Sequence, residues 1–155
     1  MSEDPAPYGT NPRNYPTIQI QGTDADRVRI GISLFRSFQW RLAREVLSEV
    51  TTKDSEAYVR ARKFLIDMKN LTLRFEEVLP EAEDLYRRFP DKELSRLSII
   101  LTLTYLERYQ EALDILDQGA TFEALRPGDR YQRACLLAPL GRYEEAIGVN
   151  HLALN

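Results

Sequence analysis

The chain has 155 residues, of which 43% are hydrophobic and 29% charged, and its 21 basic and 24 acidic side chains give a formal net charge of −3. This length accommodates one domain with its own core, and the composition is that of a folded protein and not of a disordered chain. The net negative charge argues against nucleic acid as the main partner, because phosphate binding needs an excess of Lys and Arg.

Residues 1–22 are predicted to form an extended N-terminal arm. Its prolines stand among glycine and asparagine, and proline removes backbone donors and blocks helix formation. Residues 17–21 alternate in polarity, as a short strand does. The arm is not purely polar, and its larger apolar residues are Tyr8, Tyr15, Ile18 and Ile20.

The N-terminus lacks the pattern of an exported protein. Residues 1–5 contain no basic region followed by an apolar run, so no secretory signal is predicted. No apolar stretch approaches the ~20 residues that span a bilayer, so no membrane association is expected. The single cysteine, Cys135, excludes an internal disulfide. These features favour a cytoplasmic protein.

Residues 23–155 are predicted to form one helical domain. Thr23, followed by Asp24 and Asp26, indicates a helix start, since the first turn of a helix favours acidic side chains. Turn-forming sequences then recur at 51–54, 89–91, 126–129 and 140–141. No segment between them alternates with a period of two, so we expect at least seven helices and no sheet.

An internal repeat is the strongest signal in the sequence. An aromatic residue followed three positions later by a small one occurs four times, at intervals of 35, 34 and 34 residues. The aromatic residues are Trp40, Phe75, Tyr109 and Tyr143, and the small residues are Ala43, Val78, Ala112 and Ala146. We interpret each unit as two antiparallel helices joined by a tight turn. The aromatic residue opens the second helix, and the small residue lets the two helices approach closely. Trp40, Tyr109 and Tyr143 are expected to be largely buried against their own hairpins.

This spacing resembles the tetratricopeptide repeat, whose period is about 34 residues. The resemblance covers residues 23–155 and implies an all-α fold, a right-handed superhelical array of about four antiparallel helix pairs. Gly31, after Ile30, matches a family position that allows close helix approach. The second unit departs from the pattern, because it lacks a glycine between its helices and has Lys69 where an apolar residue is expected. Pro80 indicates either a kinked second helix or one that starts later, and we favour the later start.

The resemblance also implies that the first helix of each pair lines a concave groove that holds a partner peptide. By register, the partner-binding residues are Val28, Ile32, Phe35, Lys63, Leu94, Leu97, Leu101, Tyr105 and Tyr131. The leucine row in the third unit favours an amphipathic helix or an extended apolar segment as the ligand, although the same leucines could simply pack between hairpins. The carboxylate clamp of some family members does not carry over, because Asp67 stands where the clamp requires an amide.

No pattern typical of catalysis is found, and we predict neither an enzyme nor a cofactor or metal site. The single histidine, His151, lacks companions at ligand spacing, and the seven glycines form no phosphate-binding loop. The expected function is that of an adaptor or assembly scaffold that binds another protein. A dedicated secretion-type chaperone and a self-assembling subunit are the alternatives. A homodimer could form through the groove or through the last hairpin, which lacks a capping helix.

Overall fold

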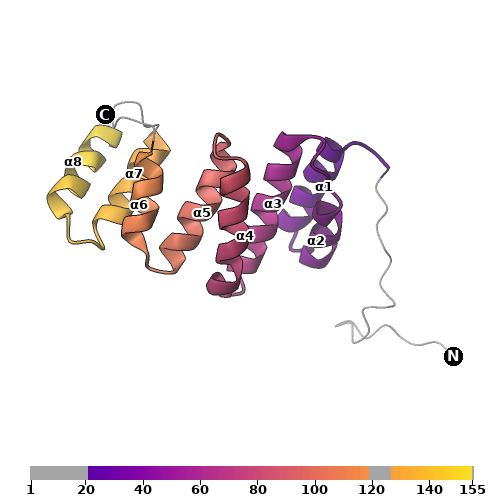
Figure 1. Cartoon of the computed structure of the whole chain (residues 1–155), viewed down its shortest axis with the longest axis horizontal. Coiled ribbons are helices and arrows are strands. Elements are labelled where there is room, and N and C mark those ends of the chain that lie inside the picture. The colour runs from indigo at the N-terminus through magenta and orange to yellow at the C-terminus, as the bar shows by residue number, and fades with distance from the viewer. Residues whose placement is uncertain (1–20, 119–126, 155) are drawn as a thin grey trace.

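The computed structural model describes residues 21–118 and 127–154, whose backbone forms eight α-helices and no strand. The prediction of an all-helical domain is confirmed for these residues, and the predicted arm lies almost entirely outside them. The helices stand side by side in a row and run alternately up and down (Figure 1). They are α1 (Asp24–Arg36), α2 (Trp40–Ser48), α3 (Ser55–Asn70), α4 (Phe75–Arg88), α5 (Glu93–Tyr105), α6 (Tyr109–Asp117), α7 (Pro127–Leu137) and α8 (Tyr143–Leu154).

Polar side chains fix where the first helices begin. The Thr23 hydroxyl accepts the amide of Asp26, and the Asp26 carboxylate accepts the amide of Thr23, which forms a reciprocal capping box at the start of α1. Asp54 caps α3 with its own side chain alone, because its carboxylate accepts the amides of Glu56 and Ala57. These caps satisfy amides that have no partner within the helix.

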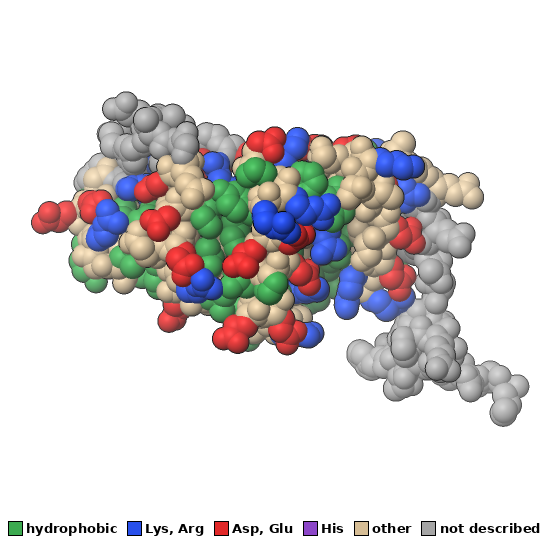
Figure 2. Space-filling view, viewed as in Figure 1, with side chains coloured by type: hydrophobic (Ala, Val, Ile, Leu, Met, Phe, Trp, Pro, Cys, Tyr) green, Lys and Arg blue, Asp and Glu red, His purple; other side chains and the backbone are tan. Residues whose placement is uncertain are grey.

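Each helix packs against its neighbours in the chain, and α3 also contacts α1 and α5 directly. The first helices of the first three hairpins, α1, α3 and α5, therefore form one layer. Figure 2 shows hydrophobic side chains between charged ones over α5 and the adjoining part of α4. The array is thus held together by apolar contacts between hairpins as well as within them.

The small residue of each repeat lies in the helix–helix contact, as predicted. Ala43, Val78 and Ala112 are fully buried, and Ala146 is 6% exposed. Short side chains at this position let paired helices approach without displacing larger neighbours. The helices also approach closely at Gly31, where an added Cβ atom would lie only 2.5 Å from the side chain of Leu47 on α2. The predicted role of Gly31 is therefore confirmed.

A left-handed residue lies in the turn after the first helix of each hairpin that the structure describes. Phe38, Leu73 and Glu107 have φ angles of 61°, 60° and 59°, and Gly141 has φ 75°. These positions recur at intervals of 35, 34 and 34 residues, in step with the aromatic and small residues. In the first, third and fourth hairpins, the amide of the following residue donates to the carbonyl five residues earlier, as Arg108 does to Leu103 at 2.9 Å. The bond closes the last helical turn.

The second hairpin lacks this bond, since the amide of Arg74 makes no described bond to the carbonyl of Lys69. The amides of Thr72 and Leu73 donate to the carbonyls of Lys69 and Asn70 at 3.0 Å, and the bond from Leu73 has counterparts at the other three left-handed residues. Lys69 is exposed and pairs through its ammonium with Glu81 on α4. Lys69 stands where the repeat pattern predicts an apolar residue. It therefore joins the two helices of the hairpin by an ion pair and not by apolar packing.

Two sequence-based expectations are wrong. Helix α4 begins at Phe75 and continues through Pro80, so the later start that we favoured does not occur. Trp40 and Tyr143 are not largely buried, with 38% and 63% of their surfaces exposed. Tyr109 is half-buried against the large core cluster. It has a hairpin on each side, whereas Tyr143 belongs to the last described hairpin and receives cover from one side only.

The buried residues fall into two clusters that meet at α3. The smaller cluster joins α1, α2 and one face of α3, with Val28, Leu47 and Leu65 among its members. The larger cluster extends from the other face of α3 to α8, and Tyr58 packs against both clusters.

We expect Gly31→Ala to lower the free energy of unfolding by about 1–2 kcal/mol. The new methyl group would overlap Leu47, and this overpacking outweighs the better helix propensity of alanine. Gly148→Ala is the matched control, because a Cβ atom there meets nothing within 4 Å. Urea unfolding of both variants checks the prediction, and equal effects would contradict it.

We expect Glu107→Gly to raise the free energy of unfolding by about 0.5–1 kcal/mol, because glycine adopts a positive φ without steric cost. Gly141→Ala places a side chain in the same conformation and should lower stability by a similar amount. The two reciprocal changes are compared by thermal unfolding. A loss of stability in Glu107→Gly would show that its side chain contributes more than its backbone conformation costs.

Candidate functional site

The structure places the nine predicted groove residues at different depths along the layer of first helices. Val28 and Ile32 are buried, and Tyr105 and Tyr131 are exposed. The half-buried residues are Phe35, Lys63, Leu94, Leu97 and Leu101. The leucine row of α5 therefore contributes to packing between hairpins while it keeps part of its surface accessible.

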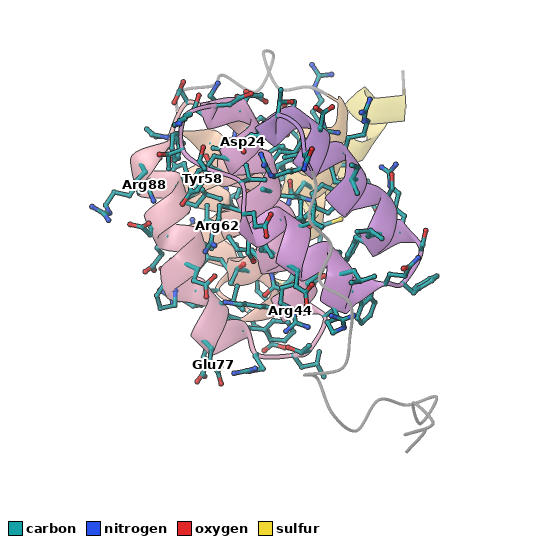
Figure 3. All side chains as sticks on the ribbon, turned by 90° about the vertical axis from the view of Figure 1, so that its right-hand side faces the viewer. Asp24, Arg44, Tyr58, Arg62, Glu77 and Arg88 are labelled. Atoms are coloured by element: carbon teal, nitrogen blue, oxygen red, sulfur yellow. The ribbon has the colours of Figure 1, made fainter. Side chains whose placement is uncertain are left out.

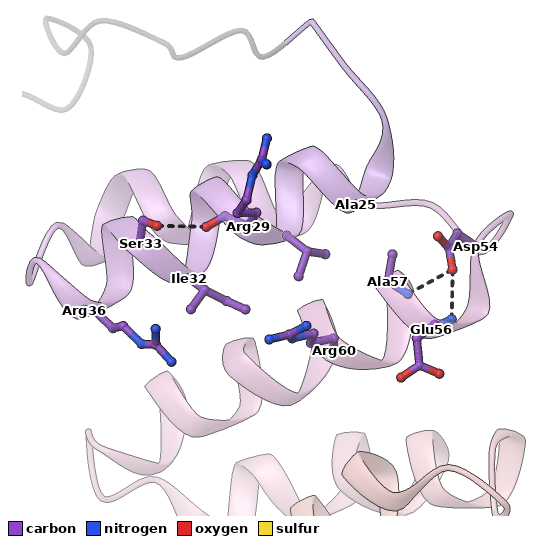
Figure 4. A pocket seen from close by; sticks show the side chains of 10 residues that line it. Ala25, Arg29, Ile32, Ser33, Arg36, Asp54, Glu56, Ala57 and Arg60 are labelled. Atoms are coloured by element: carbon purple, nitrogen blue, oxygen red, sulfur yellow. Dashed lines mark hydrogen bonds between the residues drawn. The ribbon is translucent and has the colours of Figure 1, made fainter.

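Helices α1 and α3 enclose a cavity of about 450 Å³ (Figure 4). Its apolar floor contains Val28 and Ile32 from α1 and Ala57 from α3, all of which are at most 6% exposed. Arg36 extends from the end of α1, and Arg60 extends from α3 toward the same space (Figure 4). The cavity thus combines an apolar base with two guanidinium groups at its rim.

The acidic side chains around this cavity already have partners. Asp54 Oδ1 accepts the amides of Glu56 and Ala57 at 3.1 Å each, as the dashed lines in Figure 4 show. Glu56 pairs with Lys92 of the loop before α5, at 3.0 Å between Oε2 and Nζ. This pairing raises the pKa of Lys92, because the hydrogen bond from its ammonium to Glu56 favours the charged form.

Of the three arginines that line the cavity, one has an acidic partner among the described residues and two have none. Arg29 pairs with Asp26 at 3.0 Å, within α1. Arg36 and Arg60 are exposed and make no ion pair with any residue that the structure describes. Two cations above an apolar base are suited to a ligand that presents a carboxylate next to an apolar group.

An aromatic cluster closes the α1–α3 face near the first hairpin turn. Phe35 contacts Phe64 edge to face with ring centroids 5.5 Å apart, and it stacks on Trp40 at 6.4 Å. The ammonium of Lys63 lies 4.9 Å from the centroid of the Phe64 ring and pairs with Asp67. Lys63, a predicted groove residue, is therefore engaged within its own helix.

A second cavity, of about 370 Å³, lies between α5 and α7. Leu97 lines it together with Glu93, Asp129 and Gln132. Leu97 is the predicted groove residue that this cavity contains, whereas Leu94 packs against the large core cluster. Of the nine predicted groove residues, Val28 and Ile32 line the first cavity, Leu97 lines the second, and the other six line neither.

Sequence reasoning did not select Arg36 as a site residue, whereas the register of the repeat already predicted Arg60 on the inward face of the second unit. Arg36 follows Ile32 by one helical turn, so the helical period places both on one face. The distinguishing property of these arginines is the lack of a described acidic partner, which depends on the distances between helices. Cys135 is exposed.

No group of three or more potential metal ligands occurs within the described part of the chain. Among the helices formed by these residues, none is long and apolar enough to cross a membrane. In comparisons with protein-family models, curated proteins and solved structures, none matches the chain.

We expect Asp67→Asn to change how stability depends on pH. Burial raises the pKa of Asp67 above its ordinary value, against the opposing effect of Lys63. The folded state therefore holds this proton more tightly than the unfolded chain, and wild-type stability falls as the pH rises from about 4 through the folded pKa. Asparagine removes this dependence, so the variant should gain stability relative to wild type between about pH 3 and pH 7.

Thermal unfolding at a series of pH values measures the difference between the two proteins. A difference that does not change with pH would show that Asp67 titrates at its ordinary value in the folded state.

Proposed function

We propose that this protein is an interaction module, an adaptor or assembly scaffold, that binds a segment of a partner protein between α1 and α3. The observation that carries the proposal is the cavity lined by Val28, Ile32 and Ala57, with Arg36 and Arg60 at its rim. Apolar surface supplies most of the free energy of such contacts, and cations select the ligand by charge.

We further propose that the hairpins are tetratricopeptide-type repeats in a right-handed superhelical array. The small buried residues and the left-handed turn residues support this assignment, because both recur at intervals of 34 or 35 residues. Residues 1–22 are an arm in this proposal. The layer formed by α1, α3, α5 and α7 is then the concave face, in which arrays of this kind hold peptides.

The proposed ligand is a peptide with an acidic side chain, or its own terminal carboxylate, beside an aliphatic or aromatic residue. The apolar residue would enter the cavity toward Ile32, and the carboxylate would meet Arg36 and Arg60 at the rim. Guanidinium groups match carboxylates in shape and form charge-assisted hydrogen bonds with them. The proposal assigns no catalysis to the chain and places the protein in the cytoplasm.

Selection from a displayed peptide library tests this function. We expect the wild-type protein to enrich peptides that carry an acidic residue next to an apolar one. The double variant Arg36→Glu/Arg60→Glu should lose this enrichment, with affinity for a selected peptide lowered at least about tenfold, because each substitution replaces an attractive charge with a repulsive one.

The control is Arg74→Glu/Arg87→Glu, which changes the net charge by the same amount at exposed i,i+3 pairs away from the cavity. Exposed pairs of this kind contribute little to stability. The control should retain binding. Failure of the wild type to enrich any motif, or equal binding by both double variants, would refute the proposal.

A further inference from the structure

Large apolar side chains lie exposed at the turns within the first three hairpins. These turns lie along the lower edge of the row of helices in Figure 1. The exposed residues are Phe38, Trp40, Leu71, Leu73 and Tyr105, and we call this surface the turn edge. It is distinct from the cavity between α1 and α3, since none of these five residues lines that cavity.

The demands of folding do not explain two residues of the turn edge. Phe38 and Leu73 occupy equivalent left-handed positions with φ of 61° and 60°, and they are 82% and 76% exposed. Glycine would adopt this backbone conformation at lower cost and would leave no apolar surface in water. A strained conformation combined with an exposed apolar side chain points to a role in binding.

The turn edge is large enough to form part of a specific interface. Phe38 and Trp40 are in contact, with ring centroids 6.3 Å apart, and Tyr105 stacks on Phe75 at 4.8 Å. Rings held in this way lose little freedom when a partner covers them. The five side chains expose on the order of 500 Å² of surface, which is comparable to the largest apolar patch of a typical monomer.

Charges of opposite sign stand at the two ends of the turn edge. Arg44 lies one helical turn after Trp40, and Glu107 lies two residues after Tyr105. Both are exposed, and neither makes an ion pair with another described residue. Figure 3 shows Arg44 toward the lower edge, where the turns lie, and Asp24 toward the upper edge.

We propose that the turn edge binds the turn edge of a second copy of this chain in an antiparallel, two-fold arrangement. Leu73 then lies near the symmetry axis, and Phe38 of each copy faces Tyr105 of the other. The same operation brings Arg44 of each copy toward Glu107 of its partner. A two-fold interface requires one surface to complement itself, and the order of cation, apolar centre and anion satisfies that requirement.

Sedimentation velocity of the full-length protein across a concentration series tests this proposal. We expect the wild type to dimerise and Leu73→Glu to raise the dissociation constant at least about tenfold, because the change places two carboxylates near the axis. Leu73→Gly tests whether misfolding, and not a changed interface, causes the weaker dimerisation of Leu73→Glu. This variant should unfold at a higher temperature at low protein concentration and yet dimerise more weakly.

A charge exchange tests the antiparallel arrangement. Arg44→Glu alone and Glu107→Arg alone should each weaken self-association, since each brings like charges together. An equimolar mixture of the two variants should form a heterodimer, in which both contacts pair opposite charges. The control is Tyr143→Arg, which changes an exposed aromatic residue of the last hairpin and should leave dimerisation unchanged.

Several outcomes would overturn the proposal. Wild-type protein that stays monomeric at all concentrations contradicts it, and so does a dimer that is weakened by Tyr143→Arg but not by Leu73→Glu. A monomer that dimerises only after removal of residues 1–20 would show that the N-terminal segment is the occupant. None of these results depends on the cavity between α1 and α3, so they leave the peptide-binding function untouched.

Discussion

The close approach of two helices at one small buried residue per hairpin determines much of this structure. A larger side chain at Ala43 or Ala112 would push the paired helices apart, because interiors packed at crystal-like density cannot absorb added volume. The interval of 34 or 35 residues follows from this contact, since each hairpin must present the same surface to the next. The left-handed turns recur at the same interval, so the turn edge and the layer of first helices both follow from this packing.

The sequence predicted the hairpins because the packing contact appears directly as residue size at a fixed interval. It did not predict the left-handed turns at Phe38, Leu73 and Glu107, because that conformation is usually marked by glycine and only Gly141 carries the mark. Pro80 misled the prediction of where α4 begins. Proline removes a single hydrogen bond within a helix, and the packing of Val78 and Ala82 against the core compensates for that loss.

The candidate site could be predicted only in part. Its apolar residues follow from the helical period, whereas its available charges depend on the distances between helices. The helical period identified Val28 and Ile32 as residues of the first-helix layer, and both line the cavity. The period cannot show which charged side chains already have partners. Glu56 is engaged by Lys92, which is 36 residues away, and that pairing leaves Arg36 and Arg60 as the available charges of the cavity. Information of this kind requires the distances between helices.

The position of α3 between the two buried clusters has a consequence for how the protein opens. One face of α3 packs with α1 and α2, and the other face packs with the larger cluster. The two buried clusters are therefore joined through α3. Amide hydrogens in α1 and α2 can therefore exchange with solvent through a partial opening that leaves the rest of the array folded. In the proposed complex, a ligand held by both Arg36 and Arg60 would fasten α1 to α3 and suppress that opening. Ligand binding would then appear as a rise in cooperativity, with the two units unfolding together.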